Sequence, residues 1–398
     1  MVDGIKITRT ATLPDRLRLA RYARAPELGP TILFFSGGGA LNAIGDVLTG
    51  FTHNTIHLVT PFDSGGSSAK LRRAFKMPAV GDLRNRMMAL ADKSVTGNPE
   101  VARLFSHRLP SDQDGESLSG ILRRLIDGEN RLIAAIPDPL RKIIRTHLKI
   151  FFEHMPPDFD LKGASIGNLA LTGGYLNNNR QLDPAAFILS KLAEVRGTVR
   201  TILNKDLHLA AELVNGRLVV GQHLITGREV PPLESPIKKV FLTDRLDRPL
   251  PVRPAIRQKT MDLISRAELI CFPIGSFFSS VIANLLPRGV ARAIAANDCP
   301  KIFIPNTGLD KELLGQTLAS QVDFLLFHLK QDFGDDVPDK KLLDFILLDS
   351  RRGRYEGLDE LSGRGVEGPK IIDADLITDQ GAPYLDPNKV GEILLSLV

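Results

Sequence analysis

The stretch TILFFSGGG, residues 31–39, places four adjacent apolar residues directly before a glycine-rich turn. Such a run is typical of a strand that is buried on both faces of a parallel sheet. Residues 40–51 then predict an amphipathic helix, and residues 55–60 predict a second strand that leads into DSGGSS, residues 63–68. This order of elements forms a βαβ unit. We therefore predict an α/β protein that is organised around residues 31–91.

Four segments rich in glycine, serine or asparagine follow predicted strands or begin predicted helices: residues 37–39, 63–68, 163–168 and 275–280. In open α/β sheets the ligand lies beyond the carboxyl ends of the strands, where backbone N–H groups at helix starts can bind an anion. Glycine also lets the backbone approach a phosphate closely. These segments therefore predict a phosphate or nucleotide site. Its candidate binding residues are Gly37, Gly38, Gly39, Ser64, Gly65, Gly66, Ser67, Ser68, Ser165, Gly167, Asn168, Gly275 and Ser276.

Charged residues near these segments could complete such a site. Asp63 follows the second strand, where a carboxylate could hold a divalent cation or orient a hydroxyl nucleophile. Asp82 lies in GDLRN, residues 81–85, and could either serve the site or cap a helix. Arg72 and Arg84 could neutralise phosphate charge, because guanidinium groups match phosphate oxygens.

The spacing of these residues disfavours three common kinds of site. No GxxxxGK[ST] stretch occurs, which argues against a P-loop. The glycines after the first strand stand at positions 37, 38, 39 and 45, which differs from the GxGxxG spacing of an ordinary NAD enzyme. His53 and His57 are four residues apart, but His57 falls in a predicted strand, so the two do not share a helix face that could bind zinc.

The rest of the chain predicts a helical insertion at about residues 94–156 and an antiparallel hairpin region. The hairpin is indicated by Asn215-Gly216 between two alternating segments. Pairing is predicted to become antiparallel from residue 199 and parallel again after the hairpin region. Further predicted strands are 199–203, 207–213, 218–226, 237–242, 269–273, 301–305, 345–348 and 370–372. Further predicted helices are 13–25, one that the turn at 163–169 opens and that runs past 171, 183–194 with Asp183 as N-cap, 255–266, 282–286, 290–296, 316–328 and one that begins at 386–387, with loops at 332–341 and 351–368.

Composition is that of an ordinary soluble protein. The 398 residues are 43% hydrophobic and 24% charged, and the net charge of +5 fits anionic small ligands better than nucleic acid. Two cysteines suggest neither a disulfide framework nor a cysteine metal site. We expect a cytoplasmic protein, because the N-terminus does not resemble a signal peptide. Residues 269–287 carry no charge, but Pro273, Gly275 and several serines divide them, so we expect a buried element and no membrane span.

The motifs together resemble the CofD-like superfamily. The closest matches are residues 37–39, DSGGSSAKLRR at 63–73, and residues 78–91 with GDLRN, while residues 163–169 and 273–284 match more loosely. The resemblance covers roughly residues 31–328. It implies a Rossmann-like three-layer sandwich with a mostly parallel central sheet, the helical insertion and the small hairpin region. It also implies that Asp82, Arg84 and Asn85 contact the nucleotide or phosphate.

The superfamily offers two functions. One is a transferase like 2-phospho-L-lactate transferase, which uses a nucleoside diphosphate-linked donor and passes a phospho-linked group to an acceptor hydroxyl, with Mg²⁺ at Asp63. The other is a non-catalytic nucleotide-sugar-binding regulator, as in the gluconeogenesis factor branch. Neither implies a bound flavin or NAD, a nucleic acid or a membrane, and a homodimer is one option for the assembly.

Two positions depart from the superfamily pattern. Ser64 replaces the second of two aspartates before Gly-Gly-Ser-Ser, and Ala164 replaces a histidine in the segment 163–168. Both changes weaken the transferase interpretation, while the retained Asp63 supports it. We predict an N-terminal extension at 1–30, a nucleotide-binding domain at 31–330, and a C-terminal segment at 331–398 that packs on the same domain.

Overall fold

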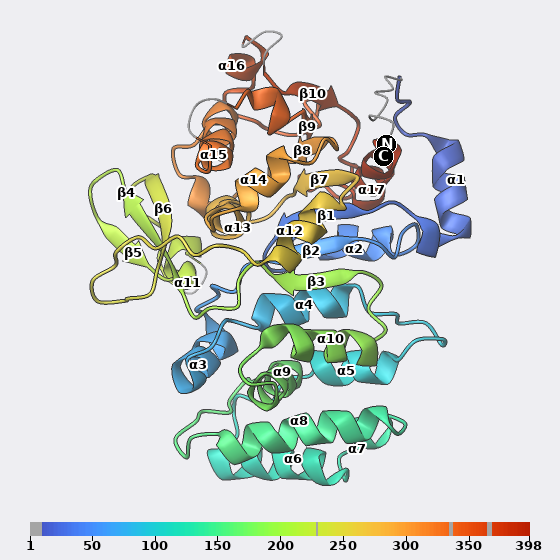
Figure 1. Ribbon diagram of the computed structural model, residues 1–398, viewed down its shortest axis with the longest axis vertical. Coiled ribbons are helices and arrows are strands. Elements are labelled where there is room, and N and C mark those ends of the chain that lie inside the picture. Colours follow the sequence, from blue (N-terminus) through green and yellow to red (C-terminus); the bar gives the residue numbers. More distant parts are fainter. Residues whose placement is uncertain (1–9, 228–229, 334–336, 364–367) are drawn as a thin grey trace.

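The computed structural model describes residues 10–227, 230–333, 337–363 and 368–398 (Figure 1). These residues fold around a seven-stranded sheet in the order β10-β9-β8-β7-β1-β2-β3, in which every pair of neighbours is parallel. The predicted α/β class is confirmed. The strands are β1 (Ile32–Ser36), β2 (Ile56–Val59), β3 (Thr198–Thr201), β7 (Leu269–Phe272), β8 (Lys301–Phe303), β9 (Phe345–Leu348) and β10 (Lys370–Asp373).

Strand β1 lies at the centre of this sheet and is buried on both faces. Ile32 and Phe34 pack into a core with α2 (Asn42–Leu48) and α17 (Pro387–Ser396). Leu33 and Phe35 point the other way, into a larger core that includes the small sheet and helices α12 to α15. This alternation follows from the period of two in a strand, and it produces the three layers.

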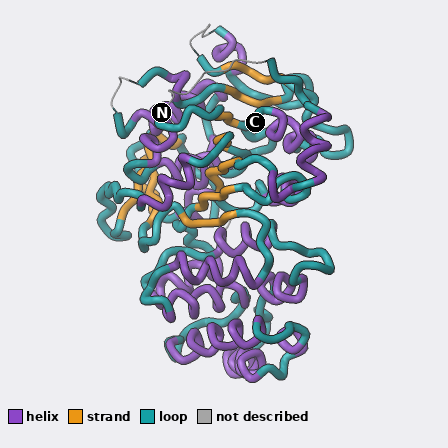
Figure 2. The backbone as a smooth tube through the Cα atoms, turned by 45° about the vertical axis from the view of Figure 1, so that its right-hand side comes forward, coloured by secondary structure: helices purple, strands orange, loops and turns teal. Residues whose placement is uncertain are grey.

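The remaining helices divide between the faces of the sheet and a separate helical lobe. Figure 2 shows the strands in the upper part of the molecule and only helices in the lower part. A second core lies between these helices and the sheet edge: it is formed by α4 to α10 with part of α3, and Val59 of β2 and Val199 of β3 join it. The helices are α1 (Arg16–Arg24), α3 (Gly66–Phe75), α4 (Gly81–Ala89), α5 (Pro99–Ser106), α6 (Gly115–Asp127), α7 (Arg131–Ala134), α8 (Leu140–His154), α9 (Ile166–Asn177), α10 (Leu182–Leu192), α11 (Gln222–Thr226), α12 (Gln258–Ser265), α13 (Ala283–Leu285), α14 (Val290–Ala295), α15 (Leu318–Lys330) and α16 (Leu358–Ser362).

The hairpin at Asn215-Gly216 is confirmed. It joins β4 (His208–Leu213) to β5 (Leu218–Val220), and β6 (Ile237–Thr243) completes an antiparallel sheet in the order β5-β4-β6. The strand predicted at 218–226 is wrong beyond Val220. Gly221 turns the chain with a φ of 117°, and α11 follows. This short helix matters for the site described below.

Two further predictions are corrected. The strand predicted at 199–203 belongs to the parallel sheet, where β3 pairs with β2 as an edge strand. Buried and half-buried residues alternate along β3, which is typical of a strand at the edge of a sheet. The matching alternation of apolar and polar residues in the sequence is why antiparallel pairing was predicted. The N-cap of α10 is Gln181 and not Asp183, which lies in the first turn and forms an ion pair with Arg200.

The uncharged segment 269–287 divides as expected, into β7, a turn, a π-helix at Phe277–Ile282 and α13. In the described part of the chain, no helix is long and apolar enough to cross a membrane.

The C-terminal segment contributes β9 and β10 to the central sheet. Asp15 donates its backbone N–H to Ser396 Oγ at 2.8 Å, so α1 and α17 lie side by side (Figure 1). The predicted loop at 351–368 contains α16, although residues 364–367 lie outside the described residues, as do residues 334–336 of the other predicted loop and residues 1–9 of the extension.

Candidate functional site

A polar cavity of about 510 Å³ opens where β1 and β2 end and where α3 and α4 begin. Twelve of the predicted site residues line it: Gly38, Gly39, Asp63, Gly65, Gly66, Ser67, Ser68, Asp82, Arg84, Asn85, Asn168 and Ser276. They come from five separated parts of the chain. The prediction that the glycine-rich segments meet at one edge of the sheet therefore agrees with the structure.

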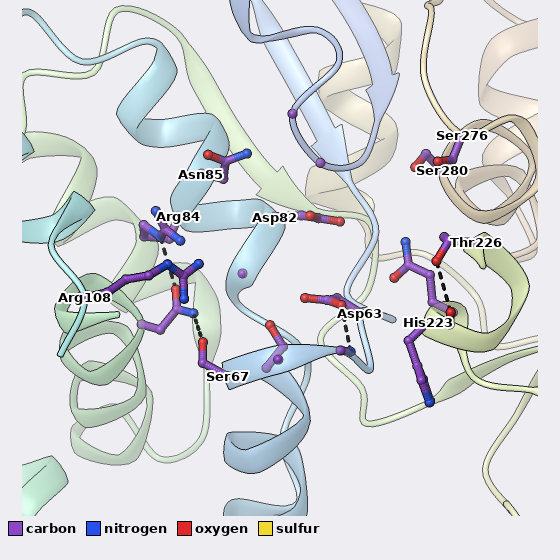
Figure 3. A pocket seen from close by; sticks show the side chains of 18 residues that line it. Asp63, Ser67, Asp82, Arg84, Asn85, Arg108, His223, Thr226, Ser276 and Ser280 are labelled. Carbon is purple, nitrogen blue, oxygen red and sulfur yellow. Dashed lines mark hydrogen bonds between the residues drawn. The ribbon is translucent and has the colours of Figure 1, made fainter. Parts of the chain in front are cut away.

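Two carboxylates, Asp63 and Asp82, lie in the central part of this cavity (Figure 3). Asp63 Oδ1 accepts a hydrogen bond from the backbone N–H of Gly65 at 3.0 Å, which holds the loop before α3. Asp82 lies in the first turn of α4 and Asp82 Oδ2 is 3.4 Å from Thr60 Oγ1. The alternative role of Asp82 as a helix cap is wrong, because the N-cap is Val80 and no side chain caps this helix.

Small residues leave room around these carboxylates. A Cβ atom added at Gly38 would lie 3.4 Å from Asp82 Oδ1, and one at Gly81 would lie 2.9 Å from Asp63 Oδ2. Carboxylate oxygens in an open polar site suit Mg²⁺, which usually takes one or two protein carboxylates and completes its shell with water and phosphate. The described residues contain no cluster of three or more acidic, histidine or cysteine side chains that could hold a metal alone. The donor set therefore fits Mg²⁺ bound together with a phosphorylated ligand.

Basic groups lie at one end of the cavity. Arg84 Nε donates to Asn168 Oδ1 at 3.3 Å, and Asn168 Nδ2 donates to Ser67 Oγ at 2.9 Å. Arg108 comes from the segment that follows α5 and lies close to Arg84 (Figure 3). Burial and the nearby charge of Arg108 lower the pKa of Arg84 to about 10, against an opposing effect of Asp82.

Arg86 holds the glycine loop, residues 37–39, through hydrogen bonds to its backbone. Its side chain is fully buried, and Nη2 donates to the carbonyl of Gly38 at 3.0 Å and to that of Gly37 at 3.4 Å. Burial lowers its pKa to about 10, and the charge of Asp82 opposes this shift. Gly37 is required by packing, because a Cβ atom there would overlap Ser280 Oγ. These two residues shape the cavity without lining it.

Arg72 does not reach the cavity, although the sequence suggested it as a phosphate ligand. Its side chain is 4% exposed, and its guanidinium forms an ion pair with Asp206 at 2.9 Å and donates to the carbonyls of Phe62 and Leu207. A side chain with these acceptors joins α3 to the small sheet. We therefore assign Arg72 a structural role.

The other predicted residues outside the cavity also have visible roles. Ser64 Oγ forms a 2.7 Å hydrogen bond with His223 Nδ1, and Ser64 lines a smaller neighbouring cavity. Ser165 is buried and donates to the carbonyl of Phe105 at 3.2 Å. Gly167 lets α9 approach α4, since a Cβ atom there would lie 2.9 Å from Arg84 Cγ. Gly275 lines an adjacent, more apolar cavity, which shares Thr226 and Ser276 with the main cavity.

Six lining residues were not among the named candidates: Gly81, Arg108, Gln222, His223, Thr226 and Ser280. Of these, Ser280 lies in the predicted segment 275–280 and Gly81 lies in GDLRN. Three of the six, Gln222, His223 and Thr226, lie on α11. The alternation of apolar and polar residues over 218–226 predicted a strand there instead of a helix. Gly221 before Gln222 was the available signal, because glycine commonly ends a strand. Nothing in the local sequence marks Arg108, which reaches the cavity only through the packing of the helical lobe.

Comparison with known proteins agrees with this geometry. The family model described as 2-phospho-L-lactate transferase CofD matches residues 32–385. The chain belongs to the CofD family. This match includes both carboxylates, the arginine end of the cavity and most of the C-terminal segment, and it confirms the resemblance inferred from the motifs.

Several relatives within the CofD family are named gluconeogenesis factors. That of Bacillus subtilis is 28% identical over 381 residues, which cover 93% of this chain and 98% of the relative. That of Listeria monocytogenes is 28% identical over 386 residues, with 94% and 97% covered. A crystal structure of a UPF0052 family member from Bacillus halodurans has the same fold, with a TM-score of 0.65, 23% identity, and 92% of this chain and 99% of that chain covered.

Proposed function

We propose that this CofD-family protein binds a nucleoside diphosphate-linked donor in the polar cavity and transfers a phospho-linked group to an acceptor hydroxyl. The observation that carries this proposal is the convergence of two carboxylates and two arginines on one cavity at the carboxyl ends of parallel strands. Arginines match phosphate oxygens, and carboxylates suit a divalent cation or a reacting hydroxyl. The family match supports the same class of reaction.

The position of each residue in the cavity suggests its role in this reaction. Asp63 and Asp82 would hold Mg²⁺, which when bound supplies positive charge against the phosphate oxygens. Asp63 would also orient the acceptor hydroxyl and take its proton as the oxygen attacks phosphorus and the bond to the leaving nucleotide breaks. Arg84 and Arg108 would stabilise the negative charge that is released. The glycine and serine loops would let the phosphates approach the backbone.

A specific observation favours a second candidate, a nucleotide-sugar-binding regulator without catalysis. Ser64 occupies the position of a second aspartate in the superfamily pattern, and its hydroxyl bonds His223 and lines the neighbouring cavity. The cavity therefore has no acidic group from that position. The relatives named gluconeogenesis factors support this candidate as well.

Two measurements separate the candidates. First, UDP- and GDP-linked compounds should raise the midpoint of thermal unfolding, and no response to any nucleotide would contradict both. Second, only the transferase requires Mg²⁺-dependent release of free nucleotide in the presence of an acceptor. Asp63→Asn should abolish that release while keeping an oxygen for the Gly65 N–H. Asp298→Ala, in an exposed loop outside the cavity, is the control and should release nucleotide like the wild type.

Binding of a nucleotide with no release across a panel of hydroxyl acceptors would leave the regulator. In that case Asp63→Asn should change only the affinity, and it should do so more strongly with Mg²⁺ present than without it. Equal release by the wild type and Asp63→Asn would show that another group performs the chemistry.

A further inference from the structure

Charged side chains are distributed unevenly along the main cavity. Arg84 and Arg108 lie at one end, the carboxylates of Asp63 and Asp82 occupy the middle, and uncharged groups such as Thr226 lie at the other end (Figure 3). A ligand that fills the cavity therefore meets arginine side chains at only one end. This arrangement indicates in which direction an anionic ligand binds.

Arg84 is held in place with part of its hydrogen-bonding capacity left over. Its side chain is 8% exposed, and Nε is the atom that bonds Asn168. A guanidinium has five N–H donors, and no partner of the two terminal nitrogens is found among the described residues. Asn168 is itself fixed by Ser67. Arg84 therefore presents pre-oriented donors to the cavity.

The backbone of α9 is adapted to this position of Arg84. A Cβ atom at Gly167 would lie 2.9 Å from Arg84 Cγ and closer still to the carbonyl of Phe105. Any larger residue would push the stem of Arg84 away from the helix. The placement of the guanidinium at the cavity is thus a product of close packing between α4 and α9.

Arg108 approaches from the helical lobe. Its Nη1 donates to the carbonyl of Gly163 at 3.0 Å, and its backbone forms an isolated bridge with Ser165. The side chain is exposed at the mouth of the cavity, near enough to Arg84 for its positive charge to lower the pKa of Arg84. A buried cation beside a second cation is unfavourable unless an anion lies between them.

We propose that Arg84 and Arg108 form a two-arginine anion clamp that binds the phosphate groups of the ligand. This inference rests on the proposed function for the identity of the ligand as a nucleotide-linked compound. It adds the direction of binding: the phosphates lie at the arginine end, and the remainder of the ligand extends past the carboxylates toward α11. Two guanidinium groups suit a diphosphate better than a monophosphate, because each can bind a separate phosphoryl group.

Calorimetric titration with inorganic pyrophosphate and with nucleoside mono- and diphosphates tests the clamp. Arg108→Met keeps the length of the side chain and removes its charge at an exposed position, so the fold should persist. It should weaken pyrophosphate and diphosphate binding at least about tenfold and should shrink the gain in affinity from the second phosphate. Arg103→Met, on the exposed face of α5, is the matched control and should bind like the wild type. Arg84→Lys keeps the positive charge but loses the paired N–H donors of the guanidinium, so its affinity for pyrophosphate should lie between those of the wild type and Arg108→Met.

The outcomes separate this inference from the proposed function. Unchanged diphosphate affinity in Arg108→Met would overturn the clamp and leave nucleotide binding intact. Binding of pyrophosphate that depends on Arg108, together with no binding of any nucleotide, would support the clamp and contradict the proposed function. Failure of the wild type to bind either probe would overturn both. Raising the ionic strength should weaken the wild type more than Arg108→Met, and equal sensitivity would also count against the clamp.

Discussion

Replacing Arg72 by methionine should destabilise the protein strongly, although Arg72 does not line the main cavity. Nη2 of Arg72 donates to Leu207 O at 2.6 Å and to Asp206 Oδ1 at 2.9 Å, and Nη1 donates to Phe62 O at 3.2 Å. The two carbonyls are buried, and each would lose its charged donor at a cost of about 1–3 kcal/mol. Asp206 is partly exposed, so its lost ion pair adds less. The two carbonyls together should lower the free energy of unfolding by about 2–6 kcal/mol.

Urea unfolding followed by far-UV circular dichroism measures this change. Arg73→Met is the matched control, because Arg73 is the next residue of α3 and its side chain is exposed. It should alter the unfolding free energy by less than about 0.5 kcal/mol. If Arg72→Met were no less stable than Arg73→Met, the structural role assigned to Arg72 would be refuted, and its original interpretation as a phosphate ligand would deserve a binding test.

Two further predictions concern Gly37, in the loop after β1, and Glu312, a buried residue of the short 3₁₀ helix Lys311–Leu313 that accepts hydrogen bonds from the backbone N–H groups of Phe278 and Ser279. Gly37→Ala should lower stability in urea unfolding because its Cβ atom would overlap Ser280 Oγ, whereas Gly39→Ala, with no atom closer than 3.8 Å, should have little effect. Equal stability of both variants would contradict the packing argument. Burial raises the pKa of Glu312 from 4.5 to about 7, so the folded state keeps a proton that the unfolded state has released in this interval. The free energy of unfolding should therefore fall as pH rises from about 5 to about 7, and Glu312→Gln, whose amide can still bond Ser279, should remove part of that fall. If the urea midpoints of the wild type and Glu312→Gln changed identically with pH, Glu312 would not titrate between about pH 5 and 7.

Much of the fold was accessible from the sequence because its signals are local. The run at residues 32–35 predicted a strand buried on both faces, and β1 has that burial. Asn215-Gly216 predicted a hairpin, since these residues suit the backbone of a tight turn. The failures were also local in origin: an edge strand and a short helix both gave alternating patterns, so β3 and α11 were misread.

The sequence by itself determined the βαβ unit, the glycine loops and the presence of carboxylates and guanidinium groups near them. Only the tertiary structure decided which of those groups face the ligand. Arg72 and Arg84 carry the same guanidinium group, and each follows a leucine in a helix. Arg72 forms an ion pair with Asp206 and does not line the cavity, whereas Arg84 donates to Asn168 and does line it. Both partners are distant in the chain, and Arg108 likewise depends on the packing of a separate lobe. Side-chain direction at this site is set by long-range contacts, which no local pattern of residues encodes.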